Sequence, residues 1–175
     1  DAGRLTRPAR SGHERAEGTV ARRRKTDEEW DGTERRATPL VLVVNDDEDA
    51  CELLVRFLRH ARFRTVGAHS VQEATAAAHE HLPRAVVVDM TRGGMGASLR
   101  VLDALRGDED RRVSTTRAIL CGTSRRNREF SFQSGADGFL VRPFHLQELV
   151  DEVAAALARP LDALPRHRRD QLARG

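Results

Sequence analysis

The chain has 175 residues and a formal net charge of +3, which is the size of one domain with polar ends. Its hydrophobic fraction of 39% is enough for one core. No apolar run approaches the roughly 20 residues that a bilayer requires, so a transmembrane helix is excluded. The two cysteines, Cys51 and Cys121, are too few for a disulfide framework and lack zinc-site spacing. We therefore expect buried thiols in a cytoplasmic protein that does not contact a membrane.

Charge and periodicity divide the chain into three parts. Residues 1–38 are rich in Arg, Glu, Gly and Thr without helical or strand periodicity, which predicts a disordered charged extension. A short arm that contacts DNA, lipid or a partner is the alternative for this part. Residues 39–158 are periodic and mildly acidic, so we expect a folded domain that does not bind nucleic acid. Residues 159–175 contain two prolines and a basic cluster, and we expect a basic C-terminal tail without a packed core.

Five short apolar runs alternate with amphipathic segments between residues 39 and 158. The runs are typical of strands buried on both faces, and the segments between them repeat apolar residues with a helical period. The expected strands are Leu40–Val44, Phe63–Ala68, Ala85–Val88, Ala118–Gly122 and Gly138–Val141. Helices are expected over residues 50–61, 70–80, 99–105 and 146–157, with one or two turns within 125–134. Three glycines within Thr91–Ala97 predict a loop there.

Alternation of strands and helices predicts an α/β fold, namely a doubly wound five-stranded parallel sheet with helices on both faces. In such folds the chemistry lies beyond the carboxyl ends of the strands. The polar residues at these ends are Asn45, Asp46 and Asp47, then Asp89, then Thr123 and Ser124, then Arg142 and Pro143. Crowded carboxylates favour a bound cation, and Mg²⁺ prefers such oxygen ligands. A carboxylate beside such an ion can attack phosphorus. For any single aspartate, helix capping is the alternative interpretation.

Four segments closely resemble the receiver domain of two-component response regulators. They are VLVVNDDEDACELL at 41–54, AVVVDM at 85–90, ILCGTS at 119–124 and GADGFLVRPFHLQEL at 135–149. The resemblance covers residues 39–158 and implies a flavodoxin-like fold with strand order 2-1-3-4-5. It also implies phosphorelay signal transduction by a signalling module, not an enzyme, whose partners are a histidine kinase or phosphotransfer protein and an output protein that the sequence does not identify.

The resemblance also implies roles for residues at the strand ends. Asp89 would accept the phosphoryl group. Mg²⁺ would be bound by Asp46, Asp89 and the backbone carbonyl of Thr91, with Asp47 and Asn45 as further candidate ligands. The hydroxyl that contacts the phosphoryl group would be that of Thr123, and Phe139 would be the aromatic that changes rotamer with it. Arg142 occupies the position of the family's lysine, and Pro143 would follow a cis peptide bond.

Several positions depart from the family's pattern. Asn45 replaces a carboxylate, which predicts a weakened Mg²⁺ site. Arg142 replaces a compact lysine with a planar fork, and this exchange is not conservative. The segment between Thr123 and Gly135 is about three residues shorter than usual, so we expect a short fourth helix. These departures support an alternative, a degenerate pseudo-receiver that acts as an unphosphorylated protein-interaction module.

A third interpretation is a phosphatase of the haloacid-dehalogenase type, which also uses an aspartate nucleophile at a strand end. Such enzymes usually carry a second aspartate two residues after the nucleophile, and here that residue is Thr91. Their nucleophile also usually follows the first strand, whereas Asp89 follows the third. Both features weigh against this class.

Overall fold

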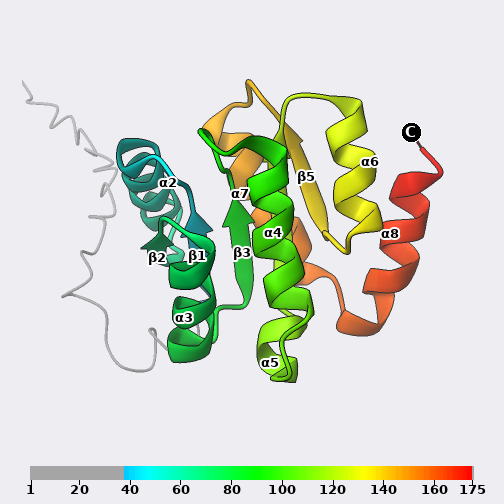
Figure 1. Ribbon diagram of the computed structural model, residues 1–175, viewed down its shortest axis with the longest axis horizontal. Coiled ribbons are helices and arrows are strands. Elements are labelled where there is room, and N and C mark those ends of the chain that lie inside the picture. Colours follow the sequence, from blue (N-terminus) through cyan, green and yellow to red (C-terminus); the bar gives the residue numbers. More distant parts are fainter. Residues whose placement is uncertain (1–37, 175) are drawn as a thin grey trace, which may run out of the picture. The chain divides into compact units, whose positions relative to one another are not determined.

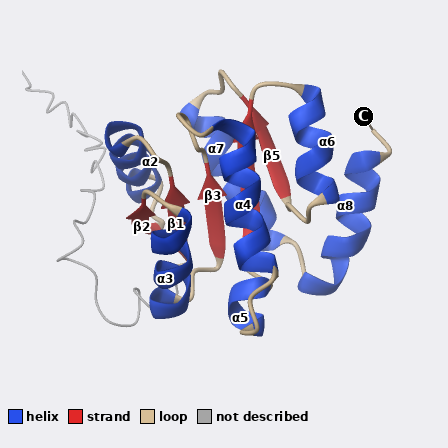
Figure 2. Cartoon of the chain, viewed as in Figure 1, coloured by secondary structure: helices blue, strands red, loops and turns tan. Residues whose placement is uncertain are grey.

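The computed structural model describes residues 38–174, and its five strands form a single parallel sheet (Figures 1 and 2). The strands are β1 Leu40–Val44, β2 Arg64–Ala68, β3 Ala85–Val88, β4 Arg117–Gly122 and β5 Gly138–Val141. Their order is β2-β1-β3-β4-β5, and all neighbours are parallel. The predicted fold class and strand order are confirmed. The extension predicted for residues 1–38 lies, as far as residue 37, outside the described residues.

Helices cover both faces of the sheet. They are α2 Glu48–His60, α3 Val71–His81, α4 Gly94–Arg106, α5 Arg111–Ser114, α6 Arg125–Gln133, α7 Leu146–Ala158 and α8 Leu164–Leu172, with the 3-10 helix η2 at Leu161–Ala163. None of the helices within residues 38–174 is both long and apolar enough to cross a bilayer.

The three central strands β1, β3 and β4 are buried on both faces, because successive side chains point alternately to two cores. Leu42 and Val44 of β1 belong to the core beneath α3 and α4. Val41 and Val43 belong to the opposite core, beneath α2 and α7. All four side chains are fully buried. The two cores fix the ends of β1 and β3. They therefore also fix the positions of the polar residues that follow these strands.

The loop predicted for Thr91–Ala97 is shorter than expected, since α4 already begins at Gly94. Gly94 makes the turn into the helix with a positive φ of 62°. The following turns bury Ala97 and Val101 against the sheet. This burial outweighs the poor helix propensity of the glycines. The fourth of the helices predicted from the family, α6, is short, with nine residues.

The prediction that residues 159–175 lack a packed core is wrong for α8. Leu164 at the start of α8 is only 4% exposed. α8 lies beside α6, at the side of the domain where β5 forms the edge of the sheet (Figure 1). The sequence of α8 is mostly polar, so apolar periodicity gave no signal for it. Its anchors are charged side chains, and their partners are distant in the sequence.

Candidate functional site

The candidate site lies where β1 and β3 end side by side. Val44 is opposite Val88 in the parallel register, and the Asp89 amide donates to the Val44 carbonyl at 2.9 Å. This hydrogen bond continues the sheet by one residue and places Asp89 next to Asn45. The predicted convergence of polar residues at the carboxyl edge of the sheet follows directly from this register.

Asp89 is a buried carboxylate whose hydrogen bonding is incomplete. The residue is 6% exposed, and its Oδ1 lies 3.3 Å from Nε of Arg142. Neither of these two atoms has a hydrogen-bond partner within residues 38–174. Burial raises the pKa of Asp89, Arg142 opposes this shift and the Asp46 charge adds to it. The site therefore keeps a carboxylate oxygen of Asp89 close to the positively charged guanidinium of Arg142, without the hydrogen bonds that would satisfy this oxygen.

Asp46 is held by the loop that follows β3. Its Oδ1 accepts from the Arg92 amide at 2.9 Å, and its Oδ2 accepts from the Gly93 amide at 2.6 Å. Burial raises the pKa of Asp46, but the amides of Arg92 and Gly93 outweigh it and hold this pKa below its usual value. A Cβ at residue 93 would lie 3.1 Å from Oδ2 of Asp46 and 2.5 Å from Cβ of Ala97. Glycine is therefore required for this close approach.

The two residues that flank Asp46 also bind this loop. Oδ1 of Asn45 accepts from the Asp47 amide at 2.9 Å and from Thr91 Oγ1 at 3.1 Å. Asp47 caps α2 by accepting from the Ala50 amide at 3.1 Å, and its other oxygen accepts from Arg92 Nη2 at 3.1 Å. Residues 45–47 and 91–93 thus form one hydrogen-bonded unit, which we call the loop latch. Sequence reasoning missed Arg92 and Gly93, because nothing local shows that a backbone amide will face a carboxylate.

The loop latch decides which oxygens remain for a cation. Both lone pairs of Asn45 Oδ1 are used, so this side chain has no free oxygen. Asp47 is engaged as a helix cap and in the pair with Arg92. Within residues 38–174 there is no group of three or more His, Cys, Asp or Glu side chains arranged to hold a metal. Asp46 and Asp89 remain, and Mg²⁺ is commonly held by one or two carboxylates together with water. The unsatisfied Oδ1 of Asp89 fits such an ion.

Thr123 directly follows β4, and Phe139 is the second residue of the neighbouring strand β5. The Thr123 amide and hydroxyl both donate to Oδ1 of Asn127, at 3.1 and 3.3 Å. A Cβ at Gly122 would lie 2.7 Å from Phe139 Cζ and 3.0 Å from Asn127 Cβ. Gly122 therefore provides the space for the aromatic ring. Asn127 and Gly122 are further residues of the site that the sequence did not single out.

Arg142 reaches the site from the end of β5. Its amide donates to the Gly122 carbonyl at 2.7 Å, and the peptide bond to Pro143 is cis. The side chain is 25% exposed, so the guanidinium is partly accessible beside Asp89. The structure thus brings Asp46, Asp89 and Arg142 together. It directs Asn45 and Asp47 into the loop latch instead.

Comparison with known proteins agrees with this geometry. Residues 41–154 match the sequence model of the response regulator receiver domain. The chain therefore belongs to the response regulator receiver family.

Similar full-length proteins include the transcriptional regulatory protein PrrA of Mycobacterium tuberculosis, 38% identical over 126 residues. Another is the DNA-binding response regulator MtrA of Mycolicibacterium smegmatis, 32% identical over 122 residues. These matches cover 70% of the chain but only 51% and 52% of the relatives, so the chain spans about half of their length.

Solved structures share the fold. A putative response regulator from Chloroflexus aurantiacus has a TM-score of 0.61 at 27% identity, over 70% of this chain and 99% of that chain. The chemotaxis protein CheY4 of Vibrio cholerae has a TM-score of 0.60 at 21% identity, over 68% of this chain and 98% of that chain, a likeness of fold alone.

Proposed function

We propose that this receiver domain accepts a phosphoryl group on Asp89 from a phosphohistidine of a histidine kinase or phosphotransfer protein. The observation that supports this most is the state of Asp89, a buried carboxylate with an unsatisfied oxygen beside Arg142. A buried carboxylate costs free energy unless it is fully paired, so an unsatisfied one beside a cation is a candidate for a chemical role. As a member of the receiver family, the chain acts in two-component signalling.

In the proposed step, a carboxylate oxygen of Asp89 forms a bond to phosphorus while the phosphorus–nitrogen bond of the donor breaks. The electron pair of that bond returns to the imidazole nitrogen. Arg142 favours the reactive, deprotonated form of Asp89 and offsets charge on the phosphoryl oxygens. The Thr123 hydroxyl is available to a phosphoryl oxygen once it leaves Asn127. The domain is thus a substrate of its kinase and not itself an enzyme that turns over.

Asp46, Asp89 and the backbone carbonyl of Thr91 are the residues that would hold Mg²⁺. The ion would supply positive charge beside the phosphoryl oxygens. The two amide hydrogen bonds to Asp46 compete with this role, and Asn45 offers no free oxygen. Weak binding of Mg²⁺ is the expected consequence.

We further propose a cytoplasmic setting and an output partner outside the described domain. The relatives PrrA and MtrA are named as regulatory and DNA-binding proteins. Since the chain spans only half of their length, any link between this domain and DNA is part of the proposal. The folded domain itself is not proposed to bind nucleic acid.

A second candidate, an unphosphorylated interaction module, is favoured by the loop latch. In the latch Asp46 accepts hydrogen bonds from two backbone amides, and Asp47 pairs with Arg92. These contacts stabilise the two acidic side chains from within the domain. Interaction with a partner would then not depend on Asp89.

Phosphorylation by a small donor distinguishes the two candidates. The full chain is incubated with acetyl phosphate, or with beryllofluoride, across a range of Mg²⁺ concentrations, and the products are followed by intact mass and amide spectra. A phosphoryl adduct that requires Mg²⁺ and is absent in Asp89→Asn supports the phosphoacceptor. Asp103→Asn is the matched control, because Asp103 is an exposed aspartate of α4 outside the site. No adduct at high Mg²⁺ would favour the interaction module.

A further inference from the structure

The C-terminal helix α8 is fastened to the domain by a buried carboxylate. Asp137, just before β5, is fully buried. Its Oδ1 accepts from Arg168 Nε and Nη2 of α8 at 3.0 and 2.7 Å. Its backbone carbonyl accepts from Arg159 Nη1 at 2.9 Å and lies 3.1 Å from His167 Nε2. A two-pronged bond from arginine to a buried carboxylate fixes orientation as well as position.

Helix α8 also contacts α6. Arg128 Nη1 donates to the Gln171 carbonyl at 3.1 Å, and Nη2 donates to the Gln171 side chain. The Arg128 guanidinium also lies 5.1 Å from the ring centre of Phe132. The Phe132 ring meets that of His167 edge-on, with 6.2 Å between centres. Helix α8 therefore packs beside part of α6 (Figure 1).

Helix α8 lies beyond the part of the chain that matches the receiver family. The match to the receiver family ends at residue 154, and α8 begins at residue 164. The contacts that hold α8 nevertheless reach inside the receiver domain, to Asp137 and Arg128. The helix is an addition that depends on the exact position of α6.

The same helix α6 is tied to the candidate site at its start. Asn127 accepts both hydrogen bonds from Thr123, and the next residue, Arg128, holds Gln171 of α8. If the Thr123 hydroxyl turns to a phosphoryl oxygen, one of the two bonds to Asn127 is lost. A shift of the first turn of α6 then moves Arg128 directly. The phosphoacceptor and α8 are thus connected through one short helix.

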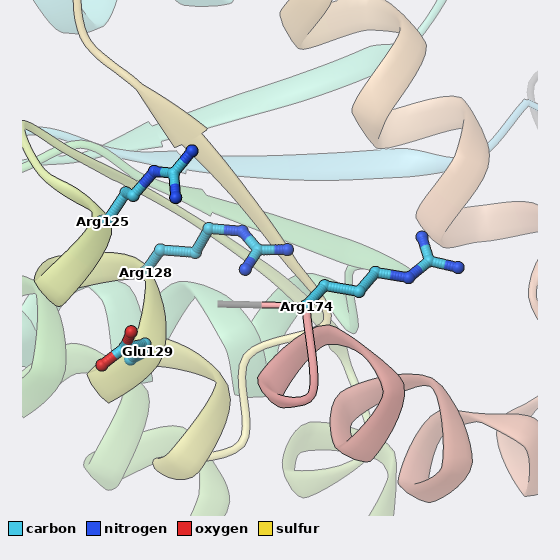
Figure 3. A pocket seen from close by; sticks show the side chains of 4 residues that line it. All are labelled: Arg125, Arg128, Glu129 and Arg174. Carbon is cyan, nitrogen blue, oxygen red and sulfur yellow. The ribbon is translucent and has the colours of Figure 1, made fainter.

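The C-terminal end of α8, where Arg128 holds Gln171, also borders a small hollow. This hollow of about 140 Å³ is lined by Arg125, Arg128, Glu129 and Arg174 (Figure 3). In this view Arg125 and Arg128 extend from α6 in a similar direction, while Glu129 points away from them. Three of the four lining side chains are arginines, and like charges repel, so this region opposes the docking of α8.

We propose that α8 is a releasable helix whose docking on α6 is opposed by phosphorylation of Asp89. The proposal rests on the proposed function of Asp89 as phosphoacceptor. Release uncovers the α6 surface around Phe132 and frees a helix rich in arginine. Coupling of this kind is reciprocal, so loosening α8 must favour phosphorylation by the same factor that phosphorylation loosens α8.

Amide hydrogen exchange of the full chain measures the docking of α8 directly. We expect the beryllofluoride adduct to speed exchange of the α8 amides about tenfold, the effect of losing one or two charged hydrogen bonds, while α7 is unchanged. Arg168→Gln should produce the same acceleration without any adduct. Asp137 retains Arg106 Nη2 at 2.9 Å and the Ala118 amide at 3.0 Å, so this variant should stay folded. Arg169→Gln is the matched control, since this exposed residue lies on the same helix without a contact to Asp137.

The reciprocal measurement separates this proposal from the proposed function. Arg168→Gln should lower the beryllofluoride concentration that half-saturates Asp89 by several-fold, whereas Arg169→Gln should not. An adduct that forms on Asp89 but changes neither α8 exchange nor this concentration would overturn the coupling and leave the phosphoacceptor intact. If no adduct forms, the Asn127→Ala variant tests the connection from Thr123 through α6 to α8 without phosphorylation. Faster α8 exchange in that variant supports the link through α6, and unchanged exchange rejects it.

Discussion

Asp89 and Asp137 are two buried aspartates that lie next to arginines. Asp89 lies at the carboxyl ends of the strands and Asp137 at the amino ends. Asp137 precedes β5 and has donors on both oxygens, from Arg106, Arg168 and the Ala118 amide. Asp89 follows β3, and within residues 38–174 its ion pair is with Arg142 at 3.3 Å and its Oδ1 has no hydrogen-bond partner. Both carboxylates are removed from water, yet only one is paired with enough donors to compensate for that removal.

This difference distinguishes a structural carboxylate from a reactive one. A satisfied carboxylate has little to gain from a new partner, so Asp137 serves to join β4, α4 and α8. An unsatisfied carboxylate gains from a cation or from hydrogen-bond donors, and its free oxygen can also attack phosphorus. Substitutions at each aspartate and its neighbours test this difference.

The largest effect is expected at Asp137. Asp137→Asn removes the charge that balances Arg106 and Arg168, which are 17% and 25% exposed. We expect a loss of about 3–5 kcal/mol in the free energy of unfolding, because breaking a buried ion pair leaves uncompensated charge. Urea unfolding followed by circular dichroism measures it. A loss below about 1 kcal/mol would mean that Asp137 is no better compensated than Asp89.

At Asn45 the effect is expected to depend on Mg²⁺. Asn45→Asp adds a buried carboxylate beside Asp46 and Asp89, so the metal-free domain should lose about 1–2 kcal/mol. Added Mg²⁺ should recover this loss, and the melting temperature should rise more with Mg²⁺ than it does in the wild type. Together with Arg142→Lys, the change should also increase the yield of adduct on Asp89. Equal Mg²⁺ responses of variant and wild type would contradict a cation site at this edge.

Asp89→Asn should have the opposite sign to Asp137→Asn. The folded pKa of Asp89 lies above its ordinary value of 3.8, so the folded state binds this proton more tightly than the unfolded state. Its charge therefore costs stability, and that cost develops as pH rises from 3.8 through the folded pKa. The neutral variant should be more stable by about 1 kcal/mol at pH 7 and equal to wild type at low pH. Thermal melts from pH 3.5 to 7 measure this, and lower stability of Asp89→Asn at pH 7 would refute it.

The smallest effect is expected in the loop latch. The side chains of Arg92 and Asp47 are 72% and 29% exposed, so Arg92→Ala should cost no more than roughly 0.5 kcal/mol. The amide bonds to Asp46 come from the backbone and survive this change. Arg100→Ala, at an exposed arginine of α4, is the control. A much larger loss from Arg92→Ala would show that its side chain, and not the backbone amides, holds the loop latch closed.

Local patterns in the sequence were sufficient for the sheet and for the positions of Asp46, Asp89 and Arg142. Strand identity depends on short apolar runs, and parallel order places their carboxyl ends together, so the edge follows from periodicity and handedness. The resemblance to receivers supplied the expected roles. Hydrogen-bond partners were beyond such reasoning. Asn45 and Asp47 were expected as possible metal ligands, but their oxygens are used within the loop latch.

How the C-terminal segment packs, and how the two aspartates differ in hydrogen bonding, became apparent from the tertiary structure alone. Arg168 meets Asp137 across 31 positions of the chain, and Arg128 meets Gln171 across 43. Such pairs leave no periodic trace, since a charged residue in the sequence looks the same whether water or a buried carboxylate receives it. Burial and the number of donors that reach each oxygen are properties of the folded chain. They make Asp137 a structural residue that connects neighbouring elements, and they leave Asp89 with an oxygen that can react.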